Sequence, residues 1–297
     1  MKKYKKCLIL FTTLIVCIFA VYSLDYIYGF SYKAKDKLVF NNEEKIVEGI
    51  REGLKKHYIK IAISFESRGN YSEHIEEIVK VWMEKALEPT GNPKEGDYLK
   101  YQIGNYKIGY KIKENKIGPD IYTIYIEPEY YQTLEQEAQV DEKVEDIIKE
   151  FGFDKDTRNV DKIQKIYSYL YNTVKYDIIH KKNDEYHLDS TAYATFIYQN
   201  ASCQGFSVAF SRLLLEVGID NRVITGYATD GEISEYHAWN LVELEGKYYN
   251  VDITWDKQTE TNDFYLKCND SFSSHKRDDK FMTKAFTSRY IDATSDY

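Results

Sequence analysis

Apolar residues in the first half of the chain follow first a helical and then a strand-like pattern. Spacings of three and four residues predict helices over 41–57 and 75–86, and alternation between them predicts a strand over 59–65. Pro89 marks the end of the second helix, because proline lacks the backbone N–H that a continuing helix needs. The folded part is therefore expected to begin with a helix, a strand and a helix.

Three strand-like runs rich in β-branched and aromatic residues come next. Their ranges are 99–103, 108–112 and 121–126. Gly104 and Asn105 separate the first two runs and predict a turn between them. Together with the preceding helices, these runs indicate a small α+β domain over residues 38–131.

The pattern changes after this domain. Residues 132–156 are acidic and helix-prone, with no glycine or proline before Gly152, which predicts a connecting helix. The next helix is marked by apolar residues at three- and four-residue spacing, namely Ile163, Ile166, Tyr167, Leu170 and Val174. We expect the catalytic domain to cover residues 157–278, with a C-terminal tail at 279–297.

Cys203 stands at the start of a further predicted helix, which Gly218 ends. The unpaired N–H groups and the positive dipole end at a helix start stabilise a thiolate, and they lower a cysteine pKa from about 8.5 towards about 3.5–7.5. The same N–H groups can receive the oxyanion of a tetrahedral intermediate. Gly205, one turn into the helix, is expected to keep the mouth of such a site open.

Two strand-like runs joined by Glu245 and Gly246 predict a β-hairpin. A loop centred on these two residues makes Leu241 face Asn250. The hairpin register can therefore be checked residue by residue.

This register makes His237 and Asp252 diagonal neighbours on one face, close enough for a carboxylate to orient an imidazole. A bulge of one residue would place them on opposite faces. With Cys203 they form a candidate catalytic triad. In it the thiolate attacks an amide carbonyl, the histidine returns a proton to the leaving amine, and the aspartate fixes the histidine tautomer.

Composition and charge exclude one class of partner. The chain of 297 residues has 43% hydrophobic residues and a formal net charge of −8. The first 24 residues hold four lysines and no acid, which leaves 36 basic and 48 acidic residues in the rest. Because such a surface repels phosphate backbones, no nucleic-acid partner is expected.

The amino terminus has the pattern of an export signal, with lysines followed by the uncharged residues 7–24. We expect residues 1–24 to be a signal peptide or a signal anchor. The uncharged run is just long enough to span a bilayer, and short residues at 21–23 offer a cleavage site. The rest of the chain is then extracytoplasmic, either secreted or anchored to the cytoplasmic membrane by this segment.

Cys203 and Cys268 are the only cysteines outside the apolar segment, so a disulfide framework is excluded. One disulfide between them is the alternative to a reactive thiol. A metal site made of Cys203, His237 and Asp252 is disfavoured, because no short ligand spacing such as CxxC or HxxxH accompanies them. No cofactor and no metal are expected.

The other candidate histidines lie in polar surroundings. His180 and His187 precede the cysteine in a charged stretch that predicts an exposed loop, and His275 lies in a charged segment expected at the surface. The triad mechanism needs none of the three.

The motifs around the triad resemble the transglutaminase-like superfamily, in its order Cys, His, Asp. They read Ser202-Cys203-Gln204-Gly205-Phe206, His237-Ala238-Trp239-Asn240 and Tyr248-Tyr249-Asn250-Val251-Asp252. The resemblance covers residues 157–278, where the segment 275–278 looks like bacterial secreted members. Phe206 departs from the tyrosine common at its position. The resemblance implies a papain-like α+β fold, with the helix bearing the cysteine packed on an antiparallel sheet bearing the histidine and aspartate.

The resemblance also implies an enzyme that acts on peptide or amide bonds through an acyl-thioester. Its substrate would be a protein or peptide, for example at the cell wall or surface. Hydrolysis is favoured over transamidation, because water is always present whereas an amine acceptor needs its own site. The alternative is a non-catalytic cell-surface binding module on the same scaffold. Residues 25–156 match no motif, so the role of the first domain is open.

Overall fold

The structure is a computed structural model that describes residues 31–34, 43–180 and 186–297. The expected signal peptide or anchor, residues 1–24, lies outside this described part. Within it, no helix combines the length and the apolar character needed to cross a membrane.

The chain forms two compact units. Of the described residues, those up to Leu87 form the first unit together with Ile103–Tyr130, and Glu88–Gln102 form the second together with those from Tyr131 to Tyr297. Residues 88–102, which were expected in the first domain, thus pack with the second unit. Asp97 accounts for this, because its carboxylate accepts a hydrogen bond from Nε of Arg222 at 2.7 Å and another from the backbone N–H of Val223 at 2.9 Å.

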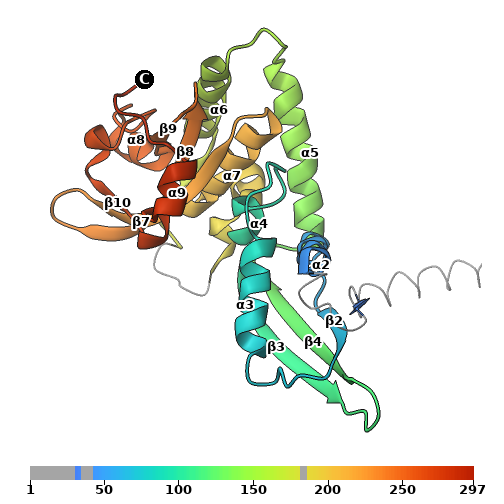
Figure 1. Ribbon diagram of the computed structural model, residues 1–297. Coiled ribbons are helices and arrows are strands. Elements are labelled where there is room, and N and C mark those ends of the chain that lie inside the picture. Colours follow the sequence, from blue (N-terminus) through green and yellow to red (C-terminus); the bar gives the residue numbers. More distant parts are fainter. Residues whose placement is uncertain (1–30, 35–42, 181–185) are drawn as a thin grey trace, which may run out of the picture. The chain divides into compact units, whose positions relative to one another are not determined.

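The first unit combines a four-stranded sheet with helices on it (Figure 1). The strand order is β1-β2-β4-β3, with β1 parallel to β2 and the other pairs antiparallel. The elements are β1 (Ser31–Ala34), α2 (Glu43–Lys55), β2 (Ile61–Ser67), α3 (Ile75–Ala86), β3 (Ile103–Lys113) and β4 (Asp120–Tyr130). Alternate residues of β2, Ile61, Ile63 and Phe65, are buried, as a half-buried strand requires. The predicted helix, strand and helix are confirmed.

The predicted turn at Gly104 and Asn105 is wrong, because both residues belong to strand β3. The strand runs through both residues, and its register against β4 shifts between Ile103 and Tyr106. A bulge of this kind bends a strand without reversing it. The expected strand over 99–103 is also wrong at its start, because Asp97–Lys100 form the short helix α4.

The second unit places helices on an antiparallel sheet with the order β10-β7-β8-β9. The strands of this sheet are β7 (Asn221–Thr229), β8 (Ser234–Leu244), β9 (Lys247–Val251) and β10 (His275–Arg277). Two further short strands, β5 (Lys175–Tyr176) and β6 (Asn200–Ala201), form a separate parallel pair. The longer helices of this unit are α5 (Leu134–Phe151), α6 (Asn159–Thr173), α7 (Cys203–Glu216), α8 (Ile253–Thr259) and α9 (Lys284–Arg289). The predicted α+β architecture, a cysteine-bearing helix on an antiparallel sheet, is confirmed.

Helix α7 lies at the centre of the second unit. Its Phe210 is fully buried and shares a core with Val242 of β8. Residues on the opposite face of the sheet, Ile224 and Trp239, pack instead with Tyr290 from the C-terminal segment. The sheet is therefore covered on both faces, and the C-terminal residues are part of the fold.

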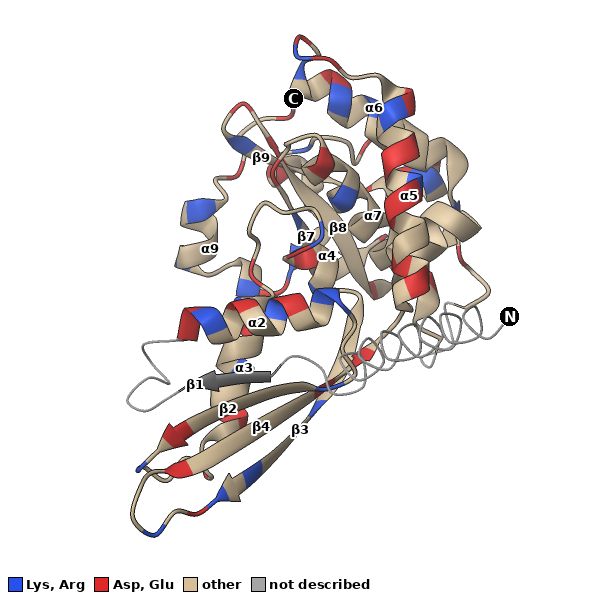
Figure 2. Ribbon diagram, turned by 90° about the vertical axis from the view of Figure 1, so that its right-hand side faces the viewer, with Lys and Arg blue, Asp and Glu red and all other residues tan. Residues whose placement is uncertain are grey.

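Helix α5 is also part of this core. Val140, Val144 and Ile147 are buried along one side, and Figure 2 shows acidic residues along the helix. Thr133 and Gln136 form a capping box at its start, each side chain accepting the other's backbone N–H. The segment predicted as a connecting helix thus packs against the cysteine-bearing helix.

Candidate active site

Cys203 is the first residue of α7, as the sequence predicts, and it is partly exposed. Ser202 precedes it in an extended conformation. A Cβ at Gly205 would lie 2.5 Å from the carbonyl oxygen of Asp189 and 2.9 Å from Cβ of Ala201. Glycine is therefore needed so that the start of the helix can approach these segments closely.

The predicted hairpin register is confirmed. Leu241 pairs with Asn250, and the ladder between β8 and β9 continues without a shift to the turn. Glu245 and Gly246 form this turn with φ values of 55° and 78°. Two left-handed residues give the turn a twist that matches that of the flanking strands.

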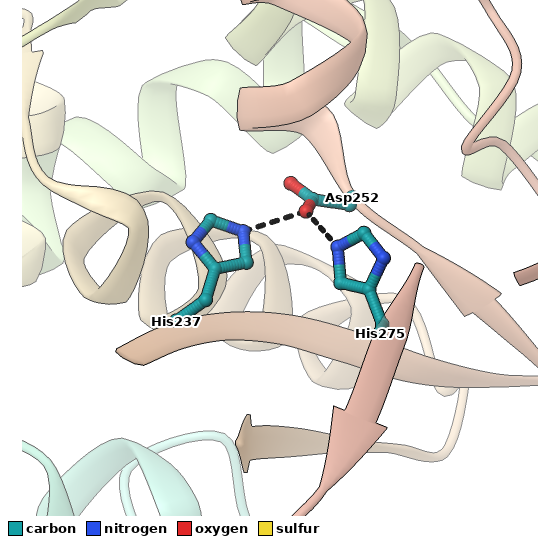
Figure 3. A group of neighbouring side chains, drawn as sticks. All are labelled: His237, Asp252 and His275. Atoms are coloured by element: carbon teal, nitrogen blue, oxygen red, sulfur yellow. Dashed lines mark hydrogen bonds and ion pairs between the residues drawn. The ribbon is translucent and has the colours of Figure 1, made fainter. Parts of the chain in front are cut away.

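The hairpin brings His237 and Asp252 into contact. His237 lies on β8, and Asp252 directly follows β9, where its Oδ1 accepts the backbone N–H groups of Thr254 and Trp255 at the start of α8. Nε2 of His237 donates to Oδ2 of Asp252 at 2.6 Å (Figure 3). Both residues are buried, with exposed fractions of 6% and 1%, so the interaction is little weakened by water.

Cys203 and His237 line the same cleft, and Cys203 is one of the groups that raise the pKa of the imidazole. Because Nε2 of His237 is taken by Asp252, Nδ1 is the nitrogen available to the thiol. Burial by itself lowers the pKa of His237, but Asp252 and Cys203 outweigh it and raise this pKa to about 10. His237 therefore keeps its proton at neutral pH, next to the sulfur, which is the arrangement of a thiolate–imidazolium pair.

A cleft of about 360 Å³ opens beside the thiol and is lined by both Cys203 and His237. His180 and His187, which the sequence places in an exposed loop, line it too. Nδ1 of His180 lies 2.7 Å from a carboxylate oxygen of Asp177. A second hollow of about 370 Å³ also reaches His237. Of the two hollows, only the first is lined by Cys203.

His275 is the residue that sequence reasoning missed. It was expected at the surface, but its side chain is 0% exposed, and its Nε2 lies 3.0 Å from Oδ2 of Asp252 (Figure 3). The expectation is wrong because β10 pairs with β7 and turns the histidine inward. The segment 275–278, which resembles bacterial secreted members, was the available signal.

Asp252 is held in its ionised form. Burial by itself favours the neutral acid, but His237 and the hydrogen bonds from His237 and His275 keep the pKa of Asp252 well below its usual range. Its Oδ1 further accepts the hydroxyl of Thr254 at 2.6 Å. A carboxylate with donors on both oxygens has little freedom to rotate.

Cys203 and Cys268 are both free thiols. The disulfide between them, the alternative to a reactive thiol, is not formed in this structure. Cys268 is buried and its sulfur lies 3.6 Å from the hydroxyl of Ser271. Cys203 is therefore the more accessible of the two thiols.

One group of ligand-type atoms could hold a metal ion, namely those of His237, Asp252 and His275, which lie within 4.8 Å of one another. Ligand atoms around a tetrahedral zinc ion stand about 3.3 Å apart, since each is about 2.0 Å from the metal. The 2.6 Å separation between His237 and Asp252 is shorter than this and fits a direct hydrogen bond. The geometry therefore favours proton transfer over metal binding.

Treatment with EDTA tests this interpretation. We expect dialysis of the full-length chain against EDTA to leave the rate at which iodoacetamide alkylates Cys203 within about twofold of its starting value, because hydrogen bonds alone hold the imidazole. The rate is read from mass spectrometry of the peptide that carries Cys203. A large change that added zinc reverses would instead assign a metal to His237, Asp252 and His275.

Comparisons with known proteins agree with this geometry. Residues 147–253 match the model of the Transglutaminase-like superfamily. The human kyphoscoliosis peptidase is 25% identical over 138 residues, which make up 42% of this chain and 19% of the human protein. The match thus spans about a fifth of the length of this relative.

Two solved structures also align with the chain. A crystal structure of a transglutaminase ("TGase") aligns with a TM-score of 0.36 and 16% identity, covering 75% of this chain and 59% of that one. A proposed cysteine protease from Cytophaga hutchinsonii aligns with a TM-score of 0.34 and 15% identity, covering 59% and 69%.

The family match contains Cys203, His237 and Asp252, the residues whose flanking motifs carry the resemblance, and it ends before His275. Residues 147–253 are therefore similar to the Transglutaminase-like superfamily, over the part of the chain that carries all three candidate residues.

Proposed function

We propose that the chain is an extracytoplasmic enzyme that cleaves peptide or amide bonds by attack of Cys203. The observation that carries the proposal is the buried contact between His237 and Asp252, with Cys203 lining the same cleft as this imidazole. A partly exposed cysteine beside a protonated histidine is the arrangement that nucleophilic catalysis by cysteine requires. The export pattern of residues 1–24 supports the location.

In the first step the Cys203 thiolate attacks the carbonyl carbon, and a carbon–sulfur bond forms. The oxyanion accepts hydrogen bonds from N–H groups at the start of α7. As the carbon–nitrogen bond breaks, His237 gives its proton to the leaving amine. Asp252 stabilises the imidazolium before this transfer and fixes the ring orientation after it.

In the second step a water molecule or an amine attacks the thioester. His237, now neutral, takes the proton of the attacking molecule, the carbon–sulfur bond breaks, and the thiolate is regenerated with the imidazolium. Hydrolysis is the favoured outcome, because water is always present whereas an amine acceptor needs its own site. A protein or peptide at the cell surface is the proposed substrate.

One experiment separates the outcomes. Full-length protein is incubated with fluorescent casein and the amine probe dansylcadaverine, and both released fragments and incorporated dansyl groups are measured. We expect fragments to exceed incorporation by about 10-fold or more. The Cys203→Ala variant should lose both signals, since it cannot form a thioester.

Two results would count against the proposal. Dominant incorporation of the amine would replace hydrolysis by transamidation at the same thiol. If wild type and Cys203→Ala both bind casein and neither changes it, the binding module becomes the better description.

A further inference from the structure

The His275 side chain is buried among aromatic rings beside the candidate triad. Its ring centroid is 4.1 Å from that of Phe272, 4.6 Å from that of Trp255 and 5.1 Å from that of Trp239. Nε2 points at Oδ2 of Asp252, the same oxygen that binds His237 (Figure 3). A polar ring enclosed by aromatic side chains, with its nitrogen on a buried carboxylate, needs an explanation beyond packing.

The hydrogen-bond partners of His275 determine its tautomer. Asp252 is ionised and can only accept, so Nε2 must carry a hydrogen. Nδ1 lies 2.9 Å from the hydroxyl of Ser274. Burial outweighs the carboxylate and lowers the pKa of His275, so the ring is neutral and Nδ1 accepts the Ser274 hydrogen.

His275 differs from the other donors to Asp252 in its place in the fold. Thr254 and Trp255 belong to the same turn as Asp252, so they fix the carboxylate relative to α8. His275 comes from β10, which pairs with β7, and β7 pairs with the strand of His237. Its hydrogen bond therefore fixes the carboxylate relative to the sheet that carries His237.

The register of the sheet makes this connection direct. Gly226 of β7 pairs with both His237 and Arg277, and Ala228, two residues on, pairs with His275. Because residues two apart share a face, both histidines start from the same face of the sheet. A side chain at Gly226 would collide with the backbone of Lys276, so glycine is what allows β10 to approach.

We propose that His275 is a positioning residue, whose Nε2–H holds the Asp252 oxygen that orients His237. It adds a fourth residue to the candidate triad, in a chain of hydrogen bonds that runs from Ser274 through His275 and Asp252 to His237, beside Cys203. The inference deepens the proposed function and rests on it, since the oriented imidazole is the one paired with the thiol.

The test measures alkylation of Cys203 by iodoacetamide in the full-length chain between pH 4 and 9. Asp252 contacts His237, and the other titratable groups in the lining of the cleft are Tyr176, Asp177, His180, Tyr186, His187, Asp189, Glu235 and Tyr236; all are kept in every variant. We expect His275→Phe to fill the aromatic pocket but to lower the rate at pH 6 by about 10-fold, because a hydrogen bond to a charged group is lost. His275→Gln, whose amide can donate, should recover the rate to within about threefold of wild type.

A matched control and a second variant make the test independent of packing. His74→Phe removes an exposed histidine of the first unit and should leave the rate unchanged. Ser274→Ala leaves the ring in place but removes the hydrogen bond to Nδ1 that helps to fix the ring orientation. The Ser274→Ala variant should slow alkylation without moving the midpoint of thermal unfolding. If His275→Phe does not fold, Ser274→Ala provides the test of the positioning role.

Nitrogen-15 NMR of histidine-labelled protein reads the tautomer without any substrate. We expect a protonated Nε2 and a bare Nδ1 for His275, and the reverse assignment overturns the proposal. Wild-type alkylation in both His275→Phe and Ser274→Ala overturns it as well, while the proposed function stands if His237→Ala still slows the reaction. If His237→Ala has no effect, the proposed function itself fails and the positioning role fails with it.

Discussion

Replacing His237 by alanine is expected to slow the alkylation of Cys203 at pH 6 by about 100-fold or more. An ordinary cysteine with a pKa of about 8.5 is less than about 1% thiolate at this pH. In the wild type a positively charged imidazolium lies beside the sulfur, because Asp252 and Cys203 outweigh burial and raise the pKa of His237 to about 10. Iodoacetamide labelling followed by mass spectrometry measures the ratio.

The pH dependence of the protein above neutral pH gives a second test of the role of His237. As pH rises through about 10, His237 loses its proton, and hydrolysis should fall because no acid remains for the leaving amine. The raised pKa also contributes folding stability that is complete below the unfolded value of about 6.5 and is lost as pH rises through about 10. The exposed His74 serves as control, since His74→Ala should change neither property. If iodoacetamide labels Cys203 equally fast in wild type and in His237→Ala, the assignment of a thiolate–imidazolium pair is wrong.

Replacing Asp252 by asparagine is expected to lower kcat by about 10³- to 10⁴-fold with little change in KM. The amide keeps the shape of the side chain but loses the charge that supports the imidazolium, and its NH₂ group faces donors from His237 and His275. In a serine protease the equivalent change from aspartate to asparagine costs a factor of this size, because the wrong histidine tautomer forms. Steady-state kinetics on the casein substrate measure the loss, and a fall of less than about 10-fold would remove Asp252 from the mechanism.

The same variant should also flatten the acid dependence of stability. Burial favours neutral Asp252, but the charge of His237 and the donors keep its folded pKa depressed. A depressed pKa stabilises the fold above the unfolded value of about 3.9, and that stability is lost as pH falls below it. Urea unfolding at pH 5 and pH 3 should therefore show a smaller loss for Asp252→Asn than for wild type. Asp156→Asn is a suitable control, because Asp156 is an exposed acid in the segment between α5 and α6 of the same unit.

The local parts of the candidate site follow from the sequence alone. The turn at Glu245 and Gly246 and the alternation on either side fix the hairpin register, and this register brings His237 towards Asp252. The helix that starts at Cys203 is equally clear, because an apolar run follows the cysteine directly. These predictions succeed since each depends on residues close together in the chain.

The sequence-based predictions are wrong where segments that are far apart in the sequence contact each other. The predicted turn at Gly104 and Asn105 fails because pairing with β4 absorbs the irregularity as a bulge within β3. Asp97 leaves the first domain because Arg222, far along the chain, holds its carboxylate. No periodic pattern reports such contacts, because they join residues with no fixed spacing.

The sequence by itself determined the helix that presents Cys203, the hairpin that aligns His237 with Asp252, and the resemblance to the transglutaminase-like superfamily. Only the tertiary structure decided the place of His275, because the pairing of β10 with β7 and the ring of aromatic side chains turn a residue from a charged segment inward. Short-range patterns encode the backbone of a site, whereas the burial of a polar side chain depends on what the rest of the fold packs against it.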